Sequence, residues 1–254
     1  MGSRLELLAP AGIPAVKPGD DLGAIIATAL DAEGLRLQSG DVRVVAQKIV
    51  SKAEGRLVDL ASVTPSARAN EVAQETGKDA RIVEIILSES VRVVRTRRDL
   101  VIVEHRLGLV MANAGVDQSN VTQDGTEQAL LLPRDPDASA RALRDALSRR
   151  YAGKLAVIIN DSVGRAWRRG TVGIAIGAAG LPSLADLRGM PDMFGRPLRT
   201  SIVGLADEIA AAASLLMGQA DEARPVVIVR GLDVSGEDLP AAALVRPQEE
   251  DLFR

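Results

Sequence analysis

The chain of 254 residues contains no cysteine and only one histidine, His105. The absence of cysteine excludes disulfides, thiolate metal sites and cysteine nucleophiles. A single histidine cannot supply a His cluster for zinc, and it gives little support to a Ser-His catalytic pair. We assign His105 no role, because a structural or surface histidine is the more common case.

Aromatic residues, long apolar runs and blocks of one charge are also scarce. Only one Trp, one Tyr and two Phe occur, so Ala, Val, Leu and Ile must fill the core. The 31 basic and 34 acidic side chains are interspersed, which favours neither nucleic acid nor a membrane surface as a partner. No stretch reaches the roughly 18 apolar residues of a membrane span, and no signal peptide precedes the first elements. We therefore expect a soluble, cytoplasmic protein.

Four segments have the apolar spacing of helices. The first follows a cap at Asp20 or Asp21. The second has Thr64 as N-cap and Pro65 at the first helical position, and the other two end at glycines. The segments are GDDLGAIIATAL (19–30), TPSARANEVAQETG (64–77), DASARALRDALSRRYAG (137–153) and GLADEIAAAASLLMG (204–218).

Segments rich in Val and Ile alternate with these helices and predict strands. The strands expected between residues 91 and 112 have short connections, which indicates an antiparallel meander. Together the elements predict an α/β fold with mixed, α+β-like sheets and not a doubly wound one. We expect a single domain over 1–254, with a possible junction between two lobes at LLPRDPDAS (131–139). The predicted strands are 42–46, 91–95, 100–105, 107–112, 155–160 and 225–231.

Two phosphate-binding motifs can be tested directly in the sequence. The P-loop pattern G-x-x-x-x-G-K-[ST] is absent. GIAIGAAG (173–180) imitates a dinucleotide fingerprint, but its spacing is G-x-x-x-G-x-x-G and LPS follows at once. We interpret it as close packing of small residues.

Hard oxygen ligands follow a predicted buried strand in IINDSVGRAWRRG (158–170). Asp161 and Ser162 are groups of the kind that Mg²⁺ or Mn²⁺ takes in phosphate chemistry. Three arginines, Arg165, Arg168 and Arg169, lie beside the only Trp and are candidates for binding phosphate or carboxylate. An Asx-turn followed by a solvated basic loop explains the same residues equally well.

A second acidic strand end occurs in NAGVDQSN (113–120), where Asp117 is accompanied by Asn113, Ser119 and Asn120. Two acids at two strand ends can share a divalent ion. Asn, Asp, Gly and Ser are also ordinary turn residues, so composition alone leaves a turn and a site equally open.

Lysines follow the strand at 42–46 in AQKIVSKAEGR (46–56), and Lys48 and Lys52 are candidate phosphate contacts. Arg56 is a third basic residue of this segment. Basic residues on an exposed helix would give the same pattern. Asp207 and Glu208 lie on an otherwise apolar helix. They can reach a site, or they can form the polar stripe of the helix. MGQADEARP (217–225) leaves that helix through Gly218 and is a candidate cover for a ligand.

Many of these stretches, in this order, resemble the coenzyme F420-0:L-glutamate ligases, the γ-glutamyl ligases of deazaflavin coenzyme biosynthesis. The resemblance extends from about residue 5 to residue 250, without the reductase domain fused to some members. The matching blocks are GIPAVKPGDDL, VSKAEGR, NAGVDQSNV, LLPRDPDASA, DSVGRAWRRGTVGIAIG, GMPDMFGRPLRTS, ADEIAAAASLLMGQ and PVVIVRGL.

The resemblance implies a fold of two intertwined subdomains and a GTP-dependent reaction. L-Glutamate is joined to F420-0 to give F420-1 and then γ-linked F420-2 or longer products, with release of GDP and phosphate. An acyl phosphate of the acceptor carboxylate is the implied intermediate. The resemblance also implies two Mg²⁺ or Mn²⁺ ions, K⁺ and a homodimer.

The same resemblance assigns roles by position. Asp117 and Asp161 match acidic metal ligands and catalytic residues, Ser162 matches a hydroxyl beside a second ion, and Gln219 stands where an archaeal member has a Glu ligand. An amide oxygen at Gln219 can still coordinate but brings no charge. Lys52 matches a catalytic, nucleotide-binding lysine. The other implied nucleotide contacts are Ile13, Pro14, Ala15, Val16, Gln47, Lys48, Asn120, Met217, Gly218, Gln219, Ala220, Asp221, Glu222, Ala223 and Arg224.

Two alternatives from other classes remain at this point. GIAIGAAG is the basis for a nicotinamide-dinucleotide oxidoreductase. The arginine cluster at 165–169 is the basis for a non-catalytic protein that binds deazaflavin or polyanions. The ligase hypothesis differs from both in requiring Asp117 and Asp161.

Overall fold

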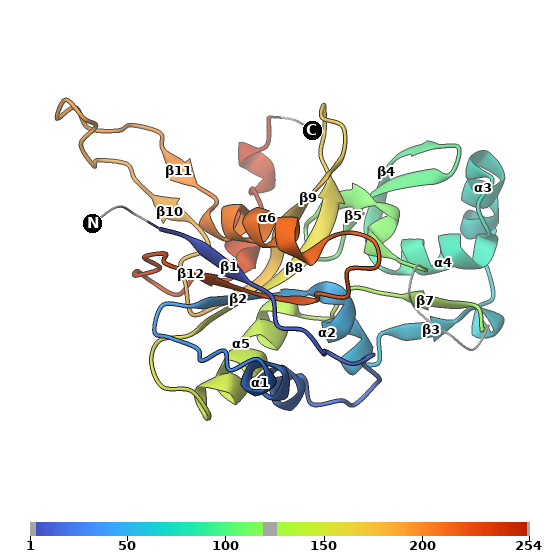
Figure 1. Ribbon diagram of the computed structural model, residues 1–254. Coiled ribbons are helices and arrows are strands. Elements are labelled where there is room, and N and C mark those ends of the chain that lie inside the picture. Colours follow the sequence, from blue (N-terminus) through green and yellow to red (C-terminus); the bar gives the residue numbers. More distant parts are fainter. Residues whose placement is uncertain (1–3, 119–125, 253–254) are drawn as a thin grey trace.

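The computed structural model describes residues 4–118 and 126–252, and it confirms an α/β fold with several mixed sheets. The largest sheet has five strands in the order β1-β12-β2-β8-β9 (Figure 1). Only the pair β2–β8 is parallel. The strands are β1 (Glu6–Leu8), β2 (Val42–Ala46), β8 (Ala156–Gly164), β9 (Thr171–Ala179) and β12 (Val226–Arg230).

Helices cover both faces of this sheet. α1 (Leu22–Ala32) and α5 (Pro136–Ser148) pack on one face, and α6 (Leu205–Met217) packs on the other (Figure 1). The inner strands β2, β8 and β12 are therefore buried on both faces, which explains their almost continuous Val and Ile content. Two apolar cores result, one on each side of the sheet.

Between β2 and β8 the chain leaves the sheet and builds a second part around a third apolar core. This part follows α2 (Gln47–Ala53) and ends before α5, so residues 131–135 lead the chain back to the sheet; the division into two lobes there stays a prediction. Its elements are β3 (Leu57–Asp59), η1 (Leu60–Ser62), α3 (Ala67–Thr76), α4 (Ala80–Ser88), β4 (Ser90–Arg97), β5 (Leu100–His105), β6 (Val110–Ala112), η2 (Asn113–Gly115) and β7 (Gln128–Leu130).

Strands β4, β5 and β6 form the predicted antiparallel meander. β10 (Ala185–Asp186) and β11 (Ile202–Val203) pair at the base of a separate arm that extends from the molecule (Figure 1). The short helices η3 (Ala241–Leu244) and η4 (Gln248–Glu250) follow the last strand. Within the described residues, no helix has both the length and the apolar character needed to cross a membrane.

Three sequence-based boundaries are wrong. Ser66, and not Thr64, caps α3, because its Oγ accepts a hydrogen bond from Ala69 N and the helix begins after it. The strand predicted at 107–112 begins only at Val110, because residues before it form a turn through Gly108 with φ +82°. The strand predicted to end at 160 continues to Gly164.

The GIAIGAAG segment lies inside β9, hydrogen-bonded to β8, and does not open a helix. Its glycines allow close approach. A Cβ at Gly173 would lie 2.0 Å from Ser214 Oγ, and one at Gly177 would lie 2.3 Å from Pro136 O. The close-packing interpretation is confirmed, and the segment lacks the strand–turn–helix geometry on which the dinucleotide alternative depends.

Candidate functional site

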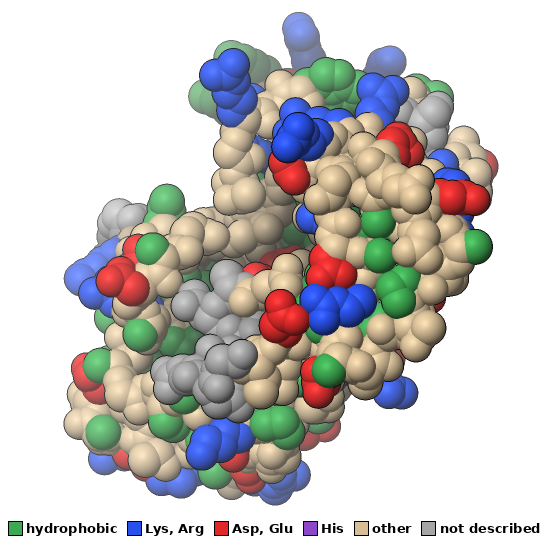
Figure 2. Space-filling model, turned by 90° about the vertical axis from the view of Figure 1, so that its right-hand side faces the viewer, with side chains coloured by type: hydrophobic (Ala, Val, Ile, Leu, Met, Phe, Trp, Pro, Cys, Tyr) green, Lys and Arg blue, Asp and Glu red, His purple; other side chains and the backbone are tan. Residues whose placement is uncertain are grey.

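A cavity of 650 Å³ opens at the carboxyl end of β2, between α2, β8 and the loop that follows α6. Every residue that the resemblance assigns to nucleotide or metal lines it, except Asn120, which lies outside the described residues. The side of the molecule at the right of Figure 1 is hollowed, and Lys and Arg side chains gather on the parts that rise above the hollow (Figure 2). The lining brings together 13–16, Gln47, Lys48, Lys52, Asp117, Asp161, Ser162 and 217–224.

Asp117 and Asp161 reach this cavity from different parts of the fold. Asp117 forms an isolated antiparallel bridge with Leu130, and its backbone N–H and C=O are both bonded to that residue. Asp161 lies within β8, opposite Ile174 of β9, just after a register shift between Ile159 and Asn160. The prediction that Asp161 follows the end of a strand is therefore wrong. The register shift lies directly before the part of β8 that lines the cavity, and such irregularities are common next to active sites.

The acidic groups are only partly neutralised by protein cations. Lys48 Nζ lies 2.7 Å from Asp117 Oδ2. Burial raises the pKa of Asp161 to about 6; the Ser162 N–H, which donates to its carboxylate at 2.9 Å, and Lys48 oppose this shift, and Asp117 adds to it. Burial and the neighbouring Lys48 lower the pKa of Lys52, against the attraction of Asp117. Two carboxylates and two ammonium groups thus act on one another across the cavity.

α2 explains why both lysines face the cavity. Lys48 and Lys52 are four residues apart on this helix and therefore lie on one face of it. Gln47 is buried at the start of the helix, where its Oε1 accepts a hydrogen bond from Ser51 Oγ. The segment is therefore helical and also brings both lysines to the cavity; their contact with phosphate stays a prediction.

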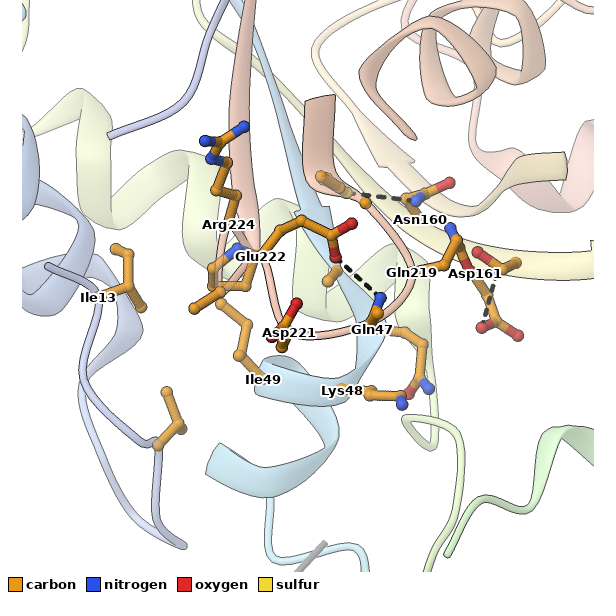
Figure 3. A pocket seen from close by; sticks show the side chains of 18 of the residues that line it. Ile13, Gln47, Lys48, Ile49, Asn160, Asp161, Gln219, Asp221, Glu222 and Arg224 are labelled. Carbon is orange, nitrogen blue, oxygen red and sulfur yellow. Dashed lines mark hydrogen bonds between the residues drawn. The ribbon is translucent and has the colours of Figure 1, made fainter. Parts of the chain in front are cut away.

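The loop 218–224 borders the cavity on the side of α6. Gly218 ends α6 with φ +73°, where Cβ would clash with the Glu222 carboxylate. Glu222 accepts a hydrogen bond from Ala220 N at 2.8 Å, and Ala223 also has a positive φ. Figure 3 shows the loop passing between Asn160 and Asp161 on one side of the view and Ile13 on the other. The predicted cover segment therefore forms part of the cavity lining.

Several other candidates lie elsewhere. Arg56 bonds Leu132 O and Glu89. His105 is fully buried, and its Nδ1 accepts from Leu107 N, so it is a structural histidine as expected. Asp207 accepts a hydrogen bond from Ala175 N of β9 and does not line the cavity. Asn113 accepts one from Val101 N and belongs to the turn.

The three arginines do not line the cavity either. Arg165, Arg168 and Arg169 lie at the exposed tip of the β8–β9 hairpin, beyond the cavity end of β8. Arg165 Nη2 donates to Arg169 O at 3.0 Å, so one of the three helps to shape the tip. Their assignment to substrate stays a prediction.

Sequence reasoning missed five lining residues: Ala46, Ile49, Asn160, Thr171 and Pro225. Asn160 had a usable signal, since it directly precedes Asp161, whereas Thr171 is located only by its pairing with Gly164 in the hairpin. Asn160 Nδ2 donates to Ser214 Oγ at 3.1 Å, which ties β8 to α6 beside the site. The others have no polar side chain that could have marked them.

The donor set of the cavity suits a hard divalent cation. Asp117, Asp161, Ser162 and Gln219 provide two carboxylates, a hydroxyl and an amide oxygen. Among the described residues, no three His, Cys, Asp or Glu side chains are grouped so that they could hold a metal ion, and only two of these four donors are charged. Burial is the main cause of the raised pKa of Asp161, and Asp117 adds to it; a bound cation would favour the charged form of both carboxylates.

Comparison with known proteins bears on this arrangement. Residues 12–231 match the family model described as F420-0:Gamma-glutamyl ligase. The chain belongs to this family. Three proteins named coenzyme F420:L-glutamate ligase are similar to it over nearly their whole length. That of Methanothermobacter thermautotrophicus is 46% identical over 98% of this chain and 99% of its own.

The other two relatives show a similar likeness. The protein of Methanopyrus kandleri is 47% identical over 94% of this chain and 93% of its own, and that of Archaeoglobus fulgidus is 41% identical over 99% and 97%. The family match includes Asp117, Asp161 and the loop 217–224. The resemblance noted from sequence blocks is thereby confirmed, and the cavity is the candidate active site of a member of this ligase family.

Proposed function

We propose that this protein is a cytoplasmic, GTP-dependent ligase that joins L-glutamate to coenzyme F420-0 and then forms F420-2 or longer γ-linked products. The observation that carries the proposal is the cavity, where segments 13–16, 46–52 and 217–224 surround Asp117 and Asp161 in a member of the F420-0:gamma-glutamyl ligase family. The named relatives are glutamate ligases of coenzyme F420.

The proposed reaction has two steps. A carboxylate oxygen of F420-0 attacks the γ-phosphorus of GTP, and GDP leaves. The amine of glutamate then attacks the acyl carbon, loses a proton, and displaces phosphate. Neither step needs a Cys, His or Ser nucleophile, so catalysis rests on positioning and on stabilising the phosphoryl charge.

The residues of the cavity have distinct parts in this reaction. Lys48 and Lys52 face the cavity as ammonium groups and would bind the nucleotide phosphates. Asp117, Asp161, Ser162 and Gln219 would hold two Mg²⁺ or Mn²⁺ ions, which supply charge stabilisation for phosphoryl transfer. When phosphates attract Lys48, its contact with Asp117 no longer neutralises that carboxylate. The segments 13–16 and 217–224, with Asn120, would enclose the nucleotide.

Two further parts of the proposal come from the family resemblance. The first is a requirement for K⁺, to which we assign no residue. The second is a homodimer, and exposed apolar side chains on the β10–β11 arm support it. Replacing K⁺ by Na⁺ in the assay tests the first, with loss of activity as the expected result.

The test of the function is product analysis by mass spectrometry. Purified protein with GTP, F420-0, glutamate and Mg²⁺ or Mn²⁺ should lengthen the acceptor by one glutamate and then by more. GDP release should require both F420-0 and glutamate. With ¹⁸O in the acceptor carboxylate, the released phosphate should carry one label if the acyl phosphate forms. Acceptor binding without any lengthening would instead support the non-catalytic alternative.

A further inference from the structure

The tip of the β8–β9 hairpin presents the only tryptophan of the chain to solvent. Trp167 is 82% exposed and has a backbone φ of +58°. A large aromatic residue at positive φ is strained, and an exposed one forfeits the stabilisation that burial would provide. Both costs fall on Trp167, so its exposed indole is a candidate for contact with a ligand.

The tip is nevertheless a defined structure. Arg165 Nη2 donates to Arg169 O at 3.0 Å and to Gly170 O at 3.4 Å, and Arg168 N donates to Arg165 O at 3.5 Å. The guanidinium of Arg165 therefore closes the loop on itself, with Trp167 inside the closed segment. Arg168 and Arg169 add positive charge next to the indole.

The hairpin is continuous with the candidate active site. β8 carries Asp161 and Ser162 at the cavity and continues to Gly164, and Thr171 of β9 lines the cavity as well. In Figure 1 the connection of β8 and β9 projects from the sheet as a narrow extension. The tip begins at Arg165, three residues after Ser162, and Trp167 is five residues after Ser162. At about 3.3 Å per residue, these two residues lie within roughly 10–16 Å of Ser162 along the chain.

The acceptor in the proposed reaction is an extended molecule with different chemical groups at its two ends. F420-0 carries its reacting carboxylate at one end, a phosphodiester in the middle and a flat deazaflavin ring at the other end. We infer that Trp167 stacks on the deazaflavin ring while the acceptor carboxylate lies in the cavity, with Arg168 and Arg169 beside the anionic linker. Trp167 is then a specificity-determining residue, an inference that rests on the proposed function for the placement of the carboxylate.

Substitution of Trp167 tests this assignment. Stacking of an aromatic side chain on a base changes affinity by about tenfold or more. Trp167→Ala should therefore raise the KM for F420-0 by about tenfold, with kcat and the KM for GTP nearly unchanged. Trp167→Phe should retain most of the affinity. An acceptor that keeps the phosphodiester and lactyl carboxylate but lacks the ring should be used equally well by wild type and Trp167→Ala.

Binding measured without turnover separates this inference from the proposed function. The fluorescence anisotropy of F420-0 gives its Kd for each variant in the absence of GTP. If wild type binds F420-0 but never lengthens it, the proposed function fails, and a weaker Kd for Trp167→Ala alone still supports ring stacking. Val91→Ala, which shortens an exposed apolar residue on β4, is the matched control and should bind like wild type.

Two results would overturn the inference. One is an unchanged Kd and KM for F420-0 in Trp167→Ala. The other is an equal loss of affinity for the ring-bearing and ring-free acceptors, together with a change of mass in light scattering, which would make Trp167 a contact between copies of the chain.

Discussion

At the scale of single residues, Glu89 is the centre of the largest ion-pair cluster among the described residues. Arg56 Nη2 lies 2.8 Å and Arg106 Nε 2.9 Å from its carboxylate, and His105 Nε2 lies at 3.6 Å. Burial alone would raise the pKa of Glu89, but His105, Arg56 and Arg106 outweigh it and lower the pKa to about 2. The cluster joins the end of α4 to the meander and to the chain that follows β7.

This cluster predicts a pH-dependent stability. The pKa of Glu89 in the folded protein lies below its ordinary 4.5, so its contribution is complete above pH 4.5 and is lost as the pH falls toward 2. Glu89→Gln should lower the free energy of unfolding by about 2–3 kcal/mol at pH 7 and by much less near pH 3. Urea denaturation at both pH values measures this. Glu71→Gln, in the exposed pair with Arg68, should change stability by less than about 0.5 kcal/mol. A pH-independent effect of Glu89→Gln would contradict the account.

Arg43 presents the opposite case. It is fully buried on β2, and none of its three guanidinium nitrogens has a hydrogen-bond partner among the described residues. Burial lowers the pKa of Arg43 to about 10, partly offset by Asp41, so the side chain stays charged at pH 7. A buried charge without hydrogen bonds costs free energy that a methionine of similar length would not.

Arg43→Met should therefore stabilise the protein by about 1–3 kcal/mol, measured as a higher midpoint in urea denaturation. Arg95→Met on the exposed strand β4 is the matched control and should have little effect. Destabilisation by Arg43→Met would show that the guanidinium makes a favourable contact in solution.

At this scale the sequence located much of the cavity lining. The carboxylates of Asp117 and Asp161 and the hydroxyl of Ser162 were candidate hard ligands from the sequence, and all three line the cavity; their role as ligands stays a prediction. The assignment of a strand end before Asp161 failed because a register shift inside β8 keeps the pairing with β9 going for several residues. Such a shift depends on the partner strand and leaves no local signal.

At the scale of elements, the small residues of β9 set how closely the helices approach the sheet. Gly177 faces the start of α5, where a Cβ would lie 2.3 Å from Pro136 O, a backbone atom that cannot turn aside. The strand therefore has to shift if any side chain is added there. The close packing read from GIAIGAAG is thus a property of helix–sheet contact.

Gly177→Ala should accordingly lower the free energy of unfolding by about 1–3 kcal/mol. Gly164→Ala is the matched control, since a Cβ at Gly164 meets nothing within 4 Å and its φ is not positive. Thermal denaturation of the two variants compares them. Equal stability of both would mean that α5 can move away from β9 without cost.

Elements with a clear apolar pattern were predicted, and most of the others were not. The strand β9 was missed although it spans nine residues, because its Gly and Ala residues do not indicate a strand. The four helices with an apolar stripe and the six Val- and Ile-rich strands all exist. α4 was missed although Asp79 caps it, because it follows α3 after only a few residues and spans nine. β1, β3 and β7 have three residues each, too few to show alternation, and their pairing is set by distant partners.

At the scale of the whole molecule, the β10–β11 arm extends from the sheet and carries apolar side chains that the chain itself does not cover. Met193 is 94% and Phe194 84% exposed, at the far end of the arm. Exposed apolar groups of this size on a projecting hairpin are typical of a contact with another chain. They support the proposed homodimer.

The double variant Met193→Ser/Phe194→Ser should weaken that dimer. Light scattering coupled to size exclusion should show wild type at twice the chain mass of 26.7 kDa and the variant shifted toward the monomer. Leu215→Ser, exposed on α6, is the control and should leave the mass unchanged. A monomeric wild type would contradict the proposed assembly.

Product formation by variants at Asp117 and Asp161 tests directly whether the ligation requires these two carboxylates in one cavity. F420-1 formed from GTP, F420-0 and glutamate is counted by mass spectrometry for wild type, Asp117→Asn, Asp161→Asn and the arm variant Asp192→Asn, with circular dichroism as the check of folding. Each cavity variant should lose activity by about 100-fold or more, and Asp192→Asn should be as active as wild type. Folded Asp117→Asn and Asp161→Asn proteins that lengthen the acceptor as fast as wild type would contradict this requirement.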